Sequence, residues 1–161
     1  MNKVVVKNLI IVSTILGLVL GIAGAVPYIG IWLFLFAMIF SAPVTMVYLI
    51  MDSKLDLTTI QNSIITGAIT GFCSCIFFSC AYSILNALIF NLAHYSHNKI
   101  LTSIIINSPM WLLAVFIIFI AVVSATVNAF SGLATYYIIN YIRDTYEKNH
   151  PRDVEQTPEY E

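Results

Sequence analysis

The sequence has 161 residues, of which 60% belong to the apolar class and only 9% are charged, and its formal net charge is −1. Because soluble domains carry about 25% charged residues, this composition excludes an ordinary soluble domain. The near-neutral charge and the lack of a basic patch in the sequence also exclude a nucleic-acid partner.

Asp, Glu, Lys and Arg are missing from three long stretches, residues 8–51, 57–98 and 100–142. The hydrocarbon core of a bilayer is about 30 Å thick and takes about 20 mostly apolar residues per spanning helix. Each stretch exceeds that length. The sequence therefore predicts an all-α polytopic membrane protein, with the lipid bilayer as its first partner.

The first stretch contains a turn signal, because Pro27 is followed closely by Gly30. We expect a tight helical hairpin there, with spans over residues 8–25 and 31–51. An alternative is that the first helix is a signal peptide cleaved after Ala25. The apolar run continues past that residue, which argues against cleavage.

Pro43 lies inside the second predicted span. Its ring removes one backbone hydrogen bond and frees the carbonyl of Ile39, four residues earlier. We therefore expect a kink at this point, with the hydroxyl of Ser41 or Thr45 pairing the freed groups.

The second stretch contains no proline, and no glycine after Gly71, so it offers no good place for a turn. We predict one long helix over residues 59–92; two minimal spans are the alternative and would give five spans in all. The third stretch breaks at Ser108 and Pro109, a capping serine followed by proline at the first helical position. The fourth span is therefore predicted over residues 109–142.

The fourth helix should continue past Gly132, either as a straight extension or as a bent interfacial segment. Residues 1–148 would then form one four-span transmembrane domain, followed by an acidic, disordered tail over residues 149–161. Short loops rich in Lys and Arg stay in the cytoplasm. Only Lys99 lies on the opposite side of the predicted spans from the other six basic residues, so we expect both termini to be cytoplasmic, at the plasma membrane.

Small residues recur at every fourth position of the third predicted helix, and a shorter row runs along the first. This spacing lets helix backbones approach closely, which drives helix association in lipid. Because four residues turn a helix by about 400°, the row drifts around the third helix, which should contact different partners at different depths. The alternative is that Gly and Ser are simply common in membrane helices. The predicted packing positions are Ser13, Gly17, Gly21, Ser63, Gly67, Gly71, Cys75, Ser79 and Ser83.

The most polar side chains within the predicted spans are two asparagines. Each can form an interhelical hydrogen bond, worth about 0.6 kcal/mol on average. The alternative is a polar path for a neutral solute. Ion-driven transport normally uses an ionisable group within the membrane, and the three stretches contain no Asp, Glu, Lys or Arg. The residues of this path would be Thr45, Thr66, Thr70, Asn86 and Asn128.

No metal or cofactor site is expected. Cys73 and Cys75 are two residues apart, so on a helix they point to opposite sides, and free cysteine behaves as a small apolar residue. His94 and His97 could share a metal, but the outer loop adds no carboxylate.

The sequence contains no catalytic triad and no nucleotide-binding loop, so we do not expect an enzyme. We expect a small, non-enzymatic membrane subunit that works through helix contacts, alone, as a homo-oligomer or with another membrane protein. The alternative is a small permease or channel component for a neutral solute, with the polar third helix lining the path. A membrane enzyme is the third choice.

Overall fold

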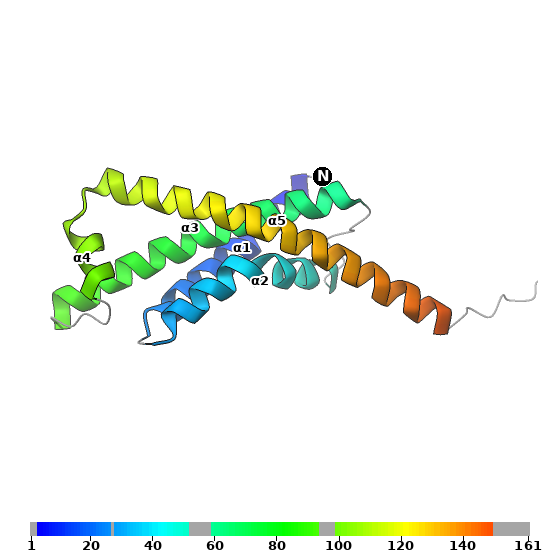
Figure 1. Ribbon diagram of the computed structural model, residues 1–161, viewed down its shortest axis with the longest axis horizontal. Helices are drawn as coiled ribbons and strands as arrows, with labels where there is room; N and C mark the ends of the chain where they lie inside the picture. Colours follow the sequence, from blue (N-terminus) through cyan, green and yellow to red (C-terminus); the bar gives the residue numbers. More distant parts are fainter. Residues whose placement is uncertain (1–2, 27, 52–58, 94–98, 150–161) are drawn as a thin grey trace, which may run out of the picture.

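The computed structural model describes residues 3–26, 28–51, 59–93 and 99–149, and in these ranges the chain forms five helices and no strand. Four of the helices are long and apolar enough to span a membrane, which confirms the predicted all-α, four-span fold (Figure 1). The helices are α1 (Lys3–Gly24), α2 (Gly30–Met51), α3 (Ile60–Ala93), α4 (Lys99–Asn107) and α5 (Met110–Asn149), of which α4 is the one too short to span.

The hairpin between α1 and α2 turns where the sequence predicts. α1 ends at Gly24 and α2 begins at Gly30, and between them Tyr28 adopts a left-handed backbone conformation with φ of 67°. A Cβ atom at Gly30 would collide with the carbonyl oxygen of Gly24, so only glycine allows so tight a return of the chain.

The order of contacts between α1 and α3 shows that these two helices are parallel. A side chain at Gly17 would collide with the backbone of Ser74, and one at Gly21 would lie 2.6 Å from the carbonyl oxygen of Phe78. Both positions advance by four residues together. The two helices therefore approach closely over at least one full turn.

The contacts between α3 and α5 run in the opposite order. A Cβ atom at Gly67 would collide with the carbonyl oxygen of Asn128, whereas one at Gly132 would lie 2.8 Å from the carbonyl oxygen of Ser63. α3 and α5 are therefore antiparallel, as a four-span bundle with alternating directions requires.

The two ends of the bundle differ in charge. α1 begins and α5 ends at one end, which we call the basic end because it carries Lys3, Lys7, Arg143 and Lys148. The α1–α2 turn and the short α4 lie at the other end, called the α4 end (Figure 1).

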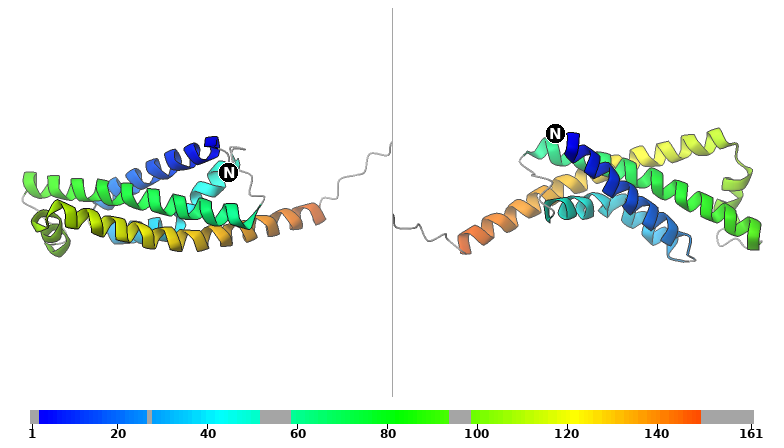
Figure 2. Two further views of the ribbon diagram at one scale, coloured as in Figure 1. Left: turned by 90° about the horizontal axis from the view of Figure 1, so that it is seen from above. Right: turned by 180° about the vertical axis from the view of Figure 1, so that it is seen from behind.

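α3 is the central helix, because it contacts each of the other four. Figure 2 shows α1 and α5 on different sides of α3, with α2 completing the bundle. The drift of the small-residue row around α3 fits this arrangement: its glycines face α5, and the neighbouring Ser74 and Phe78 meet α1.

The interior of the bundle is polar and its surface is apolar. Among the described residues, buried polar side chains outnumber buried apolar ones, and the main apolar cluster is small: Leu9, Ala42, Met46 and Leu49. Large apolar side chains are exposed along every helix. This is the reverse of a soluble core, and it suits a bundle whose solvent is lipid.

The helix boundaries agree with the sequence analysis for α3 and α5 and add one helix that it did not predict. α3 is unbroken, so the alternative with two spans in residues 59–92 is wrong. α5 runs without a break past Gly132 to Asn149, so the fourth helix continues beyond Gly132 as predicted. α4 was not predicted; its nine residues are too few to span a bilayer, so no length rule marks them. His94, His97 and residues 150–161 lie outside the described residues.

α2 changes direction partway along its length, and its last turns diverge from the line of its first turns (Figure 2). Pro43 lies inside this helix. The bend therefore has the cause that the sequence indicates, a proline that cannot donate to the carbonyl four residues earlier.

Candidate functional site: the polar cluster around Asn128

Asn128 of α5 is fully buried and its carboxamide connects two helices. The oxygen Oδ1 accepts hydrogen bonds from Ser41 Oγ at 3.0 Å and from the backbone N–H of Ala42 at 2.9 Å. The nitrogen Nδ2 donates to the carbonyl oxygens of Met38, at 2.7 Å, and of Ser124, at 3.0 Å. A carboxamide has two acceptor sites and two donor hydrogens, so these bonds use its full capacity.

Two of these partners are backbone groups that an α-helix would normally pair with each other. In an unbroken helix the N–H of Ala42 donates to the carbonyl of Met38, four residues earlier. The carboxamide of Asn128 bonds to both groups, so it bridges the α2 ladder immediately before Pro43. A side chain inserted into the ladder is a recognised cause of kinks, and here it acts beside the proline.

Serine side chains extend the cluster to α3. Ser74 Oγ donates to Ser41 Oγ at 3.1 Å, and Ser124 Oγ donates to the carbonyl oxygen of Gly71 at 3.1 Å. Ser41, Ser74 and Ser124 are all fully buried. One hydrogen-bonded network thus joins α2, α3 and α5 at the point where they cross.

Glycines on α3 make room for this network. A Cβ atom at Gly71 would lie 2.5 Å from Cβ of Asn128 and 2.6 Å from the carbonyl oxygen of Ser124. Real Cβ atoms do not approach so closely, so α5 would have to move away from α3. The close packing of α3 on α5 and the placement of the Asn128 carboxamide therefore depend on the same two glycines, Gly67 and Gly71.

Three hydroxyl groups near the network are buried without a hydrogen-bond partner among the described residues: those of Thr45, Ser63 and Thr70. All three side chains have no exposed surface. Leaving a buried hydroxyl unpaired costs about 1–3 kcal/mol, and native structures contain few such groups. The part of the core around these three hydroxyls is therefore the part in which hydrogen bonding is least complete.

The structure places some of the predicted path residues together. Thr45, Thr66, Thr70 and Asn128 are all fully buried in the half of the bundle nearer the basic end. Asn86 lies apart from them, half-buried, and its Nδ2 donates to the carbonyl oxygen of Tyr82 in its own helix. The path residues that are buried together are closed off from solvent.

The predicted packing positions also divide into a buried group and a half-buried group. Those toward the basic end, together with the row on α1, are buried at helix contacts, whereas Ser79 and Ser83 are only half-buried. The buried members are Ser13, Gly17, Gly21, Ser63, Gly67, Gly71 and Cys75. The row on α3 is thus a packed interface over its first half and an open face over its second.

Sequence reasoning missed two features of this site. It expected Ser41 or Thr45 to pair the groups freed at Pro43, but Ser41 Oγ donates to Asn128 Oδ1 of α5, and the Thr45 hydroxyl has no partner among the described residues. It also did not single out Ser74, which connects α2 to α3. The signal for Ser74 was present, because it is a polar residue one position from the small row.

No group of three or more His, Cys, Asp or Glu side chains that could hold a metal occurs in the described ranges. Cys73, Cys75 and Cys80 are free thiols in α3. The chemistry that the site offers is neutral hydrogen bonding between hydroxyl, carboxamide and backbone groups.

The fold and this core define the class: a multi-pass α-helical membrane protein with a polar, closely packed interior. Comparison of the chain with protein-family models, with curated proteins and with solved structures finds no match in any of the three. The arrangement of its own residues is therefore the ground for assigning a function.

Proposed function

We propose that this protein is a non-enzymatic subunit of the plasma membrane that acts through helix contacts within the bilayer. The observation that carries the proposal is that the buried polar side chains around Asn128 are bonded to one another and to helix backbones. Asn128, Ser41, Ser74 and Ser124 bond to one another and to helix backbones, with no surface left for a substrate. Polar groups that form hydrogen bonds between helices hold the helices together.

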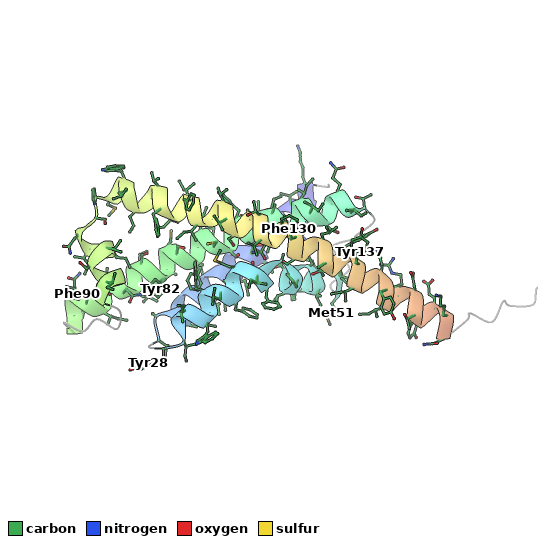
Figure 3. The ribbon with its side chains drawn as sticks, in the orientation of Figure 1. Tyr28, Met51, Tyr82, Phe90, Phe130 and Tyr137 are labelled. Carbon is green, nitrogen blue, oxygen red and sulfur yellow. The ribbon has the colours of Figure 1, made fainter. Side chains whose placement is uncertain are left out.

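The α4 end supplies a surface for contacts with a partner. The ring of Tyr82 lies beside Gly24 and Gly30, so the α1–α2 hairpin covers α3 only to that level. Residues 79–92 of α3 and residues 110–120 of α5 include no buried side chain. Figure 3 shows Phe90 well beyond Tyr28, which marks the tip of the hairpin.

Helix length supports a role for this uncovered surface. At 1.5 Å per residue, the 34 residues of α3 and the 40 of α5 extend to about 51 Å and 60 Å, against about 30 Å of hydrocarbon. A helix longer than the bilayer is thick is accommodated by tilting, by local thickening or by other adjustments, each at a modest cost. A second copy or another membrane protein on residues 79–92 would cover apolar surface that the hairpin leaves open.

The orientation in the membrane follows from charge. The basic end carries Lys3, Lys7, Arg143 and Lys148, whereas Lys99 is the only basic residue at the α4 end in the part of the chain that the structure describes. By the rule that basic loops remain inside, both termini face the cytoplasm.

Photo-crosslinking in native membranes tests the proposal. A photoreactive amino acid is placed at Leu88 of α3 or Val115 of α5, both uncovered, and at Val47 of α2 as a control of similar exposure. We expect protein adducts from the first two positions and only lipid adducts from the control. Lipid adducts alone at all three positions would contradict an interaction subunit.

One observation favours a second function, a small permease or channel component for a neutral solute. Thr45 and Thr70, two of the predicted path residues, have buried hydroxyl groups that no described residue satisfies. Such groups could bind a passing neutral solute. Reconstituted vesicles decide this: glycerol or urea entry, followed by light scattering, should match protein-free vesicles if the protein is only an interaction subunit, and should be faster if it forms a path.

A further inference from the structure

The structure assigns a conformational device to α2: the segment 44–51 is hinged at Pro43 and held in place by Asn128, and its release hydrates the hydroxyls of Thr45 and Thr70. We call the carboxamide of Asn128 with its partners Met38 and Ala42 the α2 latch. This inference does not rest on the proposed function. It concerns how the bundle opens, whichever partner or solute it serves.

The hinge is built from two neighbouring gaps in the α2 ladder. Pro43 has no N–H, so the carbonyl of Ile39 lacks its helical donor. One residue earlier, the N–H of Ala42 and the carbonyl of Met38 bond to the carboxamide of Asn128. Two backbone groups that pair with each other in an unbroken helix thus bond to a side chain of another helix, and α2 changes direction partway along its length (Figure 2).

The latch can open because the two α2 backbone groups that bond to Asn128 can bond to each other instead. If the carboxamide withdraws, the N–H of Ala42 can donate to the carbonyl of Met38 as in any α-helix. α2 then loses no backbone hydrogen bond, whereas Asn128 must find other partners. The equilibrium between the two arrangements is set by the side chain of Asn128 and its neighbours Ser41 and Ser124.

The unpaired hydroxyls lie on the side of the hinge that would move. Ser41 of α2 bonds to Ser74 of α3, and these two helices are antiparallel. Thr45 lies one turn after Ser41 and Thr70 lies one turn before Ser74, so both face the same level, nearer the basic end. Their hydroxyls are fully buried and have no hydrogen-bond partner among the described residues while the latch is closed.

Two opposing contributions therefore act on segment 44–51. Met46 and Leu49 pack with Leu9 in the apolar cluster and favour the closed position. The buried hydroxyls of Thr45 and Thr70 oppose it, because an unpaired buried hydroxyl is unfavourable and hydration would satisfy it. With the latch closed, the apolar contacts and the carboxamide prevail; without the latch, the segment moves and water reaches the two threonines.

The reactivity of an introduced thiol tests this inference. Cys73, Cys75 and Cys80 are first replaced by Ala, and a Thr45→Cys substitution then reports hydration of the moving segment. Ala37→Cys is the matched control, because Ala37 is equally buried on α2 but lies before the hinge. A water-soluble methanethiosulfonate reagent is applied to the full chain in lipid nanodiscs, where both faces are accessible.

Adding Asn128→Leu should accelerate modification of Thr45→Cys at least about tenfold, which corresponds to about 1.4 kcal/mol, and should leave Ala37→Cys unchanged. Equal acceleration at both positions would mean general loosening, and no acceleration would mean no hinge; either result overturns the inference. Pro43→Ala, with Asn128 intact, restores a donor to Ile39 and should slow modification of Thr45→Cys. If Asn128→Leu does not assemble, this second variant decides, and an unchanged or faster rate overturns the inference.

Discussion

Gly71 of α3 and Asn128 of α5 share one space: a Cβ atom at Gly71 would lie 2.5 Å from Cβ of Asn128. The absence of a side chain on one helix is what admits the most polar side chain of the other. Gly67 makes a similar approach to the backbone of Asn128, one turn earlier. The packing of α3 against α5 and the hydrogen bonds of the core are therefore a single structural feature.

Substitution of these glycines should separate the bundle at this contact. Gly67→Leu and Gly71→Leu insert a branched side chain where backbone already lies, and overpacking a filled core typically costs about 1–3 kcal/mol. Leu88→Ile is the control, because Leu88 is exposed on the same helix. The measurements are thermal stability in detergent and yield in membranes. Equal behaviour of the three variants would mean that the four-residue spacing on α3 has no packing role.

Removal of the Asn128 carboxamide should cost more than removal of the other asparagine in the membrane. Asn128→Leu leaves Ser41 and Ser124 without the carboxamide bonds they now have, and we expect a loss of about 1–3 kcal/mol. Asn86→Leu is the matched control, since Asn86 Nδ2 donates to the carbonyl oxygen of Tyr82 within its own helix. Thermal unfolding followed by intrinsic fluorescence compares the two. A larger loss for Asn86→Leu would contradict the central position of Asn128.

Replacing an unpaired hydroxyl should stabilise the closed bundle. Thr70→Val keeps the shape of the side chain and removes a buried hydroxyl that no described residue pairs, so we expect a gain of up to about 1 kcal/mol. Thr135→Val is the matched control, because Thr135 Oγ1 donates to the carbonyl of Ser131 at 2.8 Å, and its loss should be neutral or destabilising. Thermal unfolding in detergent shows whether each substitution raises or lowers the stability. A clear destabilisation by Thr70→Val would show that its hydroxyl is paired.

The orientation of the bundle has its own test. Reporter fusions before Met1 and after Glu161 should both read cytoplasmic, and a fusion beside Lys99 should read external, because the basic end carries Lys3, Lys7, Arg143 and Lys148. An external reading at the C-terminus would overturn the cytoplasmic assignment of both termini.

Much of the fold could be predicted from the sequence because the bilayer imposes simple lengths. The uncharged stretches predict four spans, Pro27 and Gly30 predict the hairpin turn, and the four-residue spacing through Gly67 and Gly71 predicts a packed face. These signals are local, so they need no knowledge of neighbouring helices. α4 was missed because its nine residues form a helix against α3, with Thr102 buried, and no length rule applies to such a segment.

The site was harder to predict because its bonds depend on the register between helices. Asn128 could be placed in the membrane from the sequence, but its partners Met38 and Ala42 are backbone groups that every residue carries. Only the relative position of α2 and α5 selects them. Ser79 and Ser83 continue the row on α3 without being fully buried, because α1 ends and α2 begins at the level of Tyr82.

The reactivity of the native cysteines tests most directly whether the small-residue row of α3 is packed and closed to water from Ser63 to Cys75. Cys75 lies on the buried row and is 2% exposed, whereas Cys73 and Cys80 are half-buried. The unmodified protein in nanodiscs is treated with a membrane-impermeant maleimide, and the modified cysteine is identified by mass spectrometry. We predict that Cys75 stays unmodified until the protein is denatured. Rapid modification of Cys75 in the folded protein would contradict a packed core and would indicate a solvated path along α3.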